Sequence, residues 1–204
     1  MQTTIDLLRH GEPVGGKQYR GHLDDPLSDL GWQQMQQVID SNISTISWDA
    51  ILTSPLKRCA DFAQSLANKT ALPLIIEPRL MEISFGDWEG RTAEELIQSE
   101  AEQLYAFWSD PFNCPPPAGE KLTAFIERTL SAWNKIQTEW QGKQILIICH
   151  AGAIRMIFCH LLGFPVERQF NIQVDYASLS RVVIEGEAET ALARLVSHQG
   201  SVHV

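Results

Sequence analysis

Arginine and histidine residues stand together in this chain in a pattern suited to phosphate chemistry. Arg9, His10 and Gly11 follow one another at the end of a short apolar run. Transfer of a phosphoryl group needs a nucleophile, and it needs positive charge and fixed hydrogen-bond donors around three equatorial oxygens. His10 is a possible nucleophile, Arg9 supplies positive charge, and Gly11 lets a ligand approach the backbone closely.

Three further positions fit the same chemistry. Arg58 ends the segment Ser54-Pro-Leu-Lys-Arg58 and falls in the first turn of a predicted helix, and a guanidinium fork suits a phosphate group well. His150 precedes another predicted helix N-terminus, where free backbone N–H groups favour an anion. Glu82 lies just before a glycine-containing turn, with Glu89 as a nearby rival carboxylate.

Two short apolar runs are expected to position the two histidines. Residues 4–8 lead into Arg9, and residues 144–149 lead into His150. Both patterns predict buried parallel strands. Because ligands of such sheets bind outside the carboxyl ends of the strands, His10 and His150 are expected to lie close together.

The alternation of strands and helices predicts a three-layer α/β/α fold with a mainly parallel central sheet. Further strands are predicted over residues 49–53, 178–184 and 191–197, and helices over residues 29–43, 56–68, 92–109, 119–140 and 153–162. Pro55 fits the first position of the second helix, and Gly163 fits the end of the last. We predict one domain over residues 1–204, with a helical insert at about 92–118 near the site.

Composition and charge exclude several classes of protein. The 204 residues are 44% hydrophobic and 20% charged, as in globular domains, and the net charge of -9 argues against nucleic-acid binding. No apolar run is long enough to span a bilayer and no signal-peptide pattern opens the chain, so no membrane partner is expected. The four cysteines show neither a C-x-x-C pair nor zinc-site spacing, which favours free thiols in the cytoplasm.

Four segments, taken in order, resemble the motifs of the histidine phosphatase superfamily, the phosphoglycerate-mutase-like group. They are Leu8-Arg-His-Gly-Glu12, Ser54-Pro-Leu-Lys-Arg58, Leu80-Met-Glu-Ile-Ser-Phe-Gly-Asp-Trp-Glu-Gly90 and Cys149-His-Ala-Gly152. The resemblance runs from about Thr4 to about Ser197. It implies that His10 is the nucleophile and that Glu82 is the general acid. It also implies that Arg9, Arg58 and His150 bind the phosphoryl oxygens.

The same resemblance bears on the substrate, a small phosphate ester. Arg20 and Gly21 lie in a segment that looks like the substrate-side loop of the superfamily, and Ala151 stands where a glycine is common. These three residues are the expected substrate contacts. Since two arginines and a histidine supply the charge that Mg²⁺ supplies elsewhere, we expect neither metal nor cofactor.

Within the superfamily, residues 6–25 are similar to bacterial members that act on alpha-ribazole 5'-phosphate in cobalamin synthesis. The resemblance therefore predicts hydrolysis of that ester. Phosphoglycerate and fructose 2,6-bisphosphate remain alternative substrates, as does a mutase reaction, although the short chain favours a phosphatase. The oligomeric state stays open.

Two other interpretations compete with a histidine nucleophile. The run from Cys149 to Arg155 fits the C-x5-R pattern of cysteine-dependent phosphatases. Against it, Ile148 and Met156 stand where a histidine and a hydroxyl residue are usual, and the pattern leaves His10 unexplained. A non-catalytic phosphate-sensing module is the second alternative. It would be expected to lack a catalytic group, and none is missing.

Overall fold

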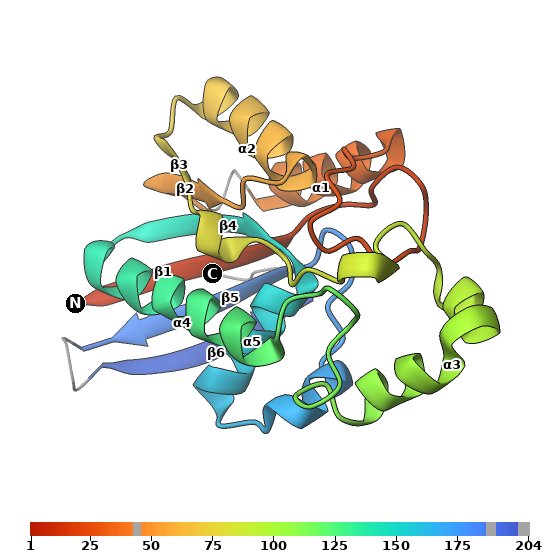
Figure 1. The fold of residues 1–204 in the computed structure, drawn as a ribbon. Helices are drawn as coiled ribbons and strands as arrows, with labels where there is room; N and C mark the ends of the chain where they lie inside the picture. Colours follow the sequence, from red (N-terminus) through yellow and green to blue (C-terminus); the bar gives the residue numbers. More distant parts are fainter. Residues whose placement is uncertain (43–45, 187–190, 200–204) are drawn as a thin grey trace.

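A six-stranded sheet forms the centre of the protein (Figure 1). The computed structural model describes residues 1–42, 46–186 and 191–199. The strand order is β3-β2-β4-β1-β5-β6, in which β1 to β4 pair in parallel and β5 and β6 pair antiparallel. The strands are β1 (Gln2–Arg9), β2 (Ala50–Thr53), β3 (Leu74–Ile76), β4 (Gln144–Cys149), β5 (Leu179–Glu185) and β6 (Leu192–His198). The predicted α/β fold with a mainly parallel sheet is confirmed.

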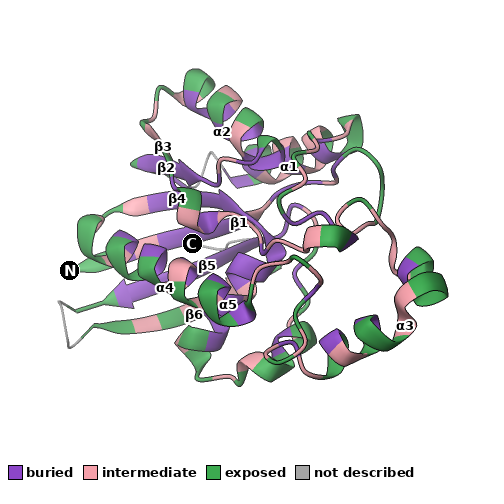
Figure 2. Cartoon of the chain, viewed as in Figure 1, coloured by how far each residue is buried: buried purple, intermediate pink, exposed green. Residues whose placement is uncertain are grey.

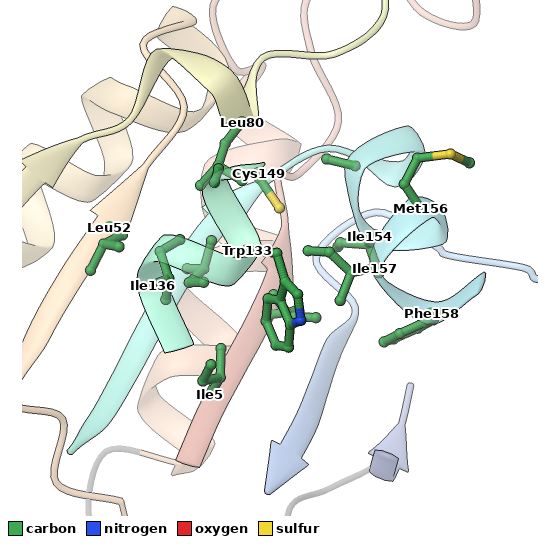
Figure 3. Packing of buried hydrophobic residues seen from close by; sticks show 14 of the residues in the cluster. Ile5, Leu52, Leu80, Trp133, Ile136, Cys149, Ile154, Met156, Ile157 and Phe158 are labelled. Carbon is green, nitrogen blue, oxygen red and sulfur yellow. The ribbon is translucent and has the colours of Figure 1, made fainter. Parts of the chain in front are cut away.

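Helices cover both faces of the sheet, which makes the three layers (Figure 1). The helices are α1 (Asp29–Asn42), α2 (Lys57–Thr70), α3 (Ala93–Ser109), α4 (Leu122–Glu139) and α5 (Ala151–Leu162). One face packs on α1 and α2 through residues such as Met35 and Phe62. The other packs on α4 and α5 through residues such as Trp133 and Phe158 (Figure 3). Since β1 and β4 are covered on both faces, they are buried along most of their length (Figure 2).

Four of the five helix starts differ from the predicted ones. The third helix begins at Ala93, because Thr92 is its N-cap. The last helix begins at Ala151, not at residue 153, with His150 as its N-cap. The second begins at Lys57, so Pro55 precedes the N-cap residue and is not the first helical position. The fourth begins at Leu122, because the Gly119 N–H closes a turn on the Pro116 carbonyl at 2.9 Å.

Other details concern short elements and chain ends. Gly163 ends α5 in the left-handed conformation, as predicted. The three-residue strand β3 was not predicted from the sequence, because its apolar run is too short to show a period. Residue 43, the predicted last residue of the first helix, lies outside the described residues.

Helix α3 stands apart from the sheet and packs near the loops at its carboxyl edge (Figure 1). A capping box between Thr92 and Glu95 starts it, and non-helical backbone at Glu100 kinks it. Its apolar side packs with Trp88 in a small cluster of its own, against which Tyr19 and Phe85 also lie. No helix in the described part of the chain is long and apolar enough to cross a membrane.

Candidate active site

His10 and His150 lie side by side at the carboxyl edge of the sheet. Each follows the last residue of a strand, and the last residues Arg9 of β1 and Cys149 of β4 are register partners. The His10 N–H donates to the Cys149 carbonyl at 3.0 Å, and the two imidazole centroids are 5.2 Å apart. The predicted proximity of the two histidines is therefore confirmed.

The His10 ring is held as a neutral nucleophile would be. Its Nδ1 lies 2.7 Å from the Gly11 carbonyl oxygen. Because a carbonyl only accepts hydrogen bonds, Nδ1 carries the proton and Nε2 keeps a free lone pair. Burial, and then the charges of Arg9 and Arg58, hold the pKa of His10 well below its usual value. The imidazole is consequently unprotonated at neutral pH.

Arg9 is fixed beside His10 by the loop that precedes β5. Its Nη1 donates to the Val174 carbonyl at 2.7 Å. The ring of Tyr176 lies under the guanidinium, with its centroid 4.0 Å from Cζ, and its centroid is 5.8 Å from that of the His10 ring. This cation–π contact fixes the plane of the guanidinium.

Arg58 and His150 form a buried unit with Ser54. The Arg58 Nε donates to His150 Nδ1 at 3.3 Å, so His150 carries its proton on Nε2, 2.8 Å from Ser54 Oγ. The Arg58 terminal nitrogens donate to the carbonyls of Leu23 and Gly21 at 2.8 and 2.7 Å. Burial, followed by the Arg58 charge, lowers the pKa of His150 well below its usual value. The hydrogen bond to His150 thus fixes the position of the Arg58 guanidinium.

The structure separates the two rival carboxylates. Glu82 accepts from the backbone N–H groups of Gly152 and Ile83, both at 3.1 Å, and lines the same cavity as His10. One oxygen of Glu89 instead accepts from His22 N, Ser84 Oγ and Phe85 N at 2.9 to 3.0 Å. Glu89 therefore closes a loop, and Glu82 is the carboxylate at the site.

A cavity of about 240 Å³ collects most of the predicted residues. Its described lining consists of Arg9, His10, Gln18, Tyr19, Arg20, Gly21, Arg58, Glu82, Phe85, Ala151, Arg155, Phe170 and Tyr176. Of the predicted site residues, His150 is not part of this lining: its side chain is fully buried, and Arg58 and Ser54 contact its two nitrogens.

The three predicted substrate contacts reach this cavity in different ways. The Arg20 guanidinium donates hydrogen bonds to the Asp25 carboxylate at 3.1 Å and to the carbonyls of residues 14 and 16, both at 2.7 Å. Gly21 has a φ of +47°, and a Cβ there would lie 2.3 Å from Glu89 Oε1. Ala151 opens α5 and presents the helix N-terminus. Arg20 and Gly21 thus shape the loop that contributes to the cavity lining, and their role as substrate contacts stays a prediction.

Several lining residues were missed by the sequence analysis. Phe85, Phe170 and Tyr176 were not singled out, and Arg155 was considered only as part of the C-x5-R pattern. Phe85 and Tyr176 lie in loops and Phe170 lies in the short 3₁₀ helix Val166–Asn171, and such segments carry no periodic signal in the sequence. Arg155 lies one turn beyond Gly152 in α5, and its nearness to the predicted helix N-terminus is the signal that could have found it.

The competing cysteine nucleophile does not fit this geometry. The Cys149 side chain is fully buried in the apolar core beside Trp133 and Leu80 (Figure 3). Burial raises the pKa of its thiol to about 12. The thiolate that such a mechanism needs is disfavoured, and the sulfur does not line the cavity.

Comparison with known proteins agrees with this geometry. The sequence model of the histidine phosphatase superfamily (branch 1) matches residues 5–197. The adenosylcobalamin/alpha-ribazole phosphatase of Escherichia coli is 31% identical over 186 residues, which cover 90% of this chain and 91% of that protein. Phosphoserine phosphatase 1 of Hydrogenobacter thermophilus is 28% identical, over 97% and 95% of the two chains. The crystal structure of the alpha-ribazole phosphatase from Shigella flexneri superposes with a TM-score of 0.82 at 30% identity, covering 98% of both chains.

Proposed function

Because the chain belongs to the histidine phosphatase superfamily, we propose that it hydrolyses alpha-ribazole 5'-phosphate through a phosphohistidine formed on His10. The protein is a phosphatase; the substrate and the residue roles are the proposal. The hydrogen bond from His10 Nδ1 to the Gly11 carbonyl carries the mechanism, because it leaves the Nε2 lone pair as the attacking group. Arg9 and Arg58 line the same cavity, and their charges act on this imidazole.

In the first step, His10 Nε2 attacks phosphorus and the ester P–O bond breaks. Arg9 and Arg58 hold the equatorial oxygens and stabilise the charge that builds on them. An alkoxide is a poor leaving group, so Glu82 donates a proton to the departing oxygen. The alcohol leaves, and the phosphoryl group stays on Nε2.

In the second step, water replaces the alcohol. The Glu82 carboxylate takes a proton from the water, which attacks phosphorus and releases phosphate and neutral His10. His150 contributes by fixing Arg58 through the Nε–Nδ1 hydrogen bond at 3.3 Å. Direct binding of a phosphoryl oxygen by His150 stays a prediction.

The charges around the cavity argue against a bisphosphate. In the described lining, Arg9, Arg58 and Arg155 have no carboxylate partner, since the cation of Arg20 is already paired with Asp25 at 3.1 Å. Glu82 carries the proton that it donates in the first step, so a bound monoester dianion leaves one positive charge of these three. The two negative charges of a second phosphate would exceed it.

The apolar part of the lining favours a flat substrate. Rings of Tyr19, Phe85, Phe170 and Tyr176 reach the cavity. The Trp108 indole N–H donates to the Tyr19 hydroxyl at 3.0 Å, so α3 stabilises the position of the Tyr19 ring. A dimethylbenzimidazole needs an apolar wall of this kind beside the phosphate site.

The deciding experiment is a side-by-side measurement of kcat/KM. The panel consists of alpha-ribazole 5'-phosphate, 3-phosphoglycerate, fructose 2,6-bisphosphate, phosphoserine and a nucleoside monophosphate. We expect the ribazole ester to exceed 3-phosphoglycerate at least ~10-fold, which is about 1.4 kcal/mol of transition-state preference. If it ranks at or below the other esters, the substrate assignment is wrong while the phosphohistidine mechanism stands.

A further inference from the structure

Arg155 stands where two cavities meet. A second cavity, of about 50 Å³, adjoins the first and is lined mainly by apolar residues such as Phe107, Leu122 and Phe125. Four residues line both cavities: Glu82, Phe85, Arg155 and Phe170. Arg9 and Arg58 line the larger cavity but not the smaller one. Arg155 therefore lies, with Glu82, at the junction of the two cavities, and its charge also acts on Arg9.

The guanidinium of Arg155 is oriented but not paired with a carboxylate. Its Nε donates to the Ile172 carbonyl at 2.9 Å, and its Cζ lies 5.7 Å from the Phe170 ring centroid. Within the described chain, no residue accepts a hydrogen bond from either terminal nitrogen of Arg155. Burial lowers its pKa, while the charge of Glu82 raises it. A half-buried cation with unused donors at a cavity indicates a ligand group.

We propose that Arg155 determines specificity by donating hydrogen bonds to an uncharged oxygen, a hydroxyl or ring ether, on the leaving alcohol. The inference deepens the proposed function and rests on Glu82 as the residue that protonates the leaving oxygen. An alcohol that departs past Glu82 must then pass Arg155. The acceptor is uncharged because the adjoining cavity is lined mainly by apolar residues, where a second anion would lose its hydration.

The test compares the phosphate esters of two five-carbon alcohols: ribose 5-phosphate, whose alcohol carries hydroxyls and a ring ether, and pentyl phosphate, whose alcohol carries no acceptor oxygen. Arg155→Met keeps the length of the side chain and removes its donors. We expect it to lower kcat/KM for ribose 5-phosphate about 10- to 100-fold, as for loss of a hydrogen bond from a charged donor. The loss for pentyl phosphate should stay below about 3-fold, and inhibition by vanadate, which lacks a leaving group, should change equally little.

Two control variants test whether the effect is specific to the guanidinium of Arg155. Arg168→Met makes the same change at an exposed arginine of the 3₁₀ helix Val166–Asn171 and should alter neither ester. Arg155→Lys keeps the charge but loses the planar fork, and it should retain part of the preference for ribose 5-phosphate even if Arg155→Met folds poorly.

Three results would overturn the proposal. Equal losses for both esters would make Arg155 a phosphoryl ligand, and no loss for either would make it a bystander. A larger loss for 3-phosphoglycerate than for ribose 5-phosphate would show that its ligand is anionic. Neither ester of the pair is alpha-ribazole 5'-phosphate. The result for Arg155 is therefore independent of whether that compound proves to be the substrate.

Discussion

Replacing Gly152 by alanine would displace Glu82 without removing it. A Cβ at position 152 would lie 2.1 Å from Glu82 Oε1 and 3.0 Å from its Cδ. Since carbon–oxygen contacts settle near about 3.5 Å, the Oε1 atom must retreat by roughly 1.4 Å from its distance of 2.1 Å. The retreat also strains the hydrogen bond that Gly152 N donates to Glu82 Oε2 at 3.1 Å.

The expected effect depends on the leaving group. A misplacement of roughly 1 Å costs about 100-fold in rate, within the range of general acid catalysis. We expect phosphoenzyme formation from ribose 5-phosphate to slow about 100-fold in Gly152→Ala. With p-nitrophenyl phosphate the loss should stay below about 3-fold, because p-nitrophenolate departs without a proton.

The assay is the single-turnover rate of phosphoenzyme formation, since dephosphorylation can mask the contrast in steady state. Glu82→Gln should show the same contrast, and Glu89→Gln, which alters a loop contact, should affect both esters equally. An alanine near the start of α5 favours the helix over glycine by up to about 1 kcal/mol, so a fold loss is not expected from the backbone. Equal slowing of both esters by Gly152→Ala, or unchanged rates, would remove Glu82 from the acid role.

Three further predictions concern the nucleophile, metals and pH. His10→Ala should abolish turnover while Cys149→Ser keeps most of it, and rapid quench should trap an acid-labile, base-stable phosphoenzyme; the opposite pattern would restore the cysteine mechanism. Activity should be complete in EDTA and inhibited by vanadate, because Arg9 and Arg58 supply the positive charge; activity that returns only with a divalent metal contradicts this. The native pKa values of His10 and His150 lie well below 6.5, so the unfolded chain binds protons that the native state does not once the pH falls below about 6.5. Stability is therefore complete above that pH and is lost below it by up to ~1.4 kcal/mol per pH unit for each histidine. Urea unfolding between pH 7.5 and 5.5 measures this slope, which should be shallower in His10→Ala; an unchanged slope would contradict the buried neutral state.

The sequence by itself determined the two central strands of the sheet and the edge of the sheet at which the two histidines lie. The runs that became β1 and β4 are apolar throughout, as strands covered on both faces must be. Parallel strands end at the same edge of a sheet, so two histidines that each follow such a run lie at that edge, and the strand order then makes them neighbours. The ends of these two strands are local features that the surrounding sequence reveals, whereas four helix starts were predicted wrongly by one to three residues.

Only the tertiary structure decided how the side chains at that edge are used. Glu82 and Glu89 share one motif, and partners from distant segments separate them: Gly152 donates to Glu82, whereas His22 donates to Glu89. Arg155 looked like the end of a cysteine motif, yet it faces the cavity while Cys149 points into the core. Long-range hydrogen bonds and the direction in which a side chain leaves its element fixed these roles, and neither leaves a periodic trace in the sequence.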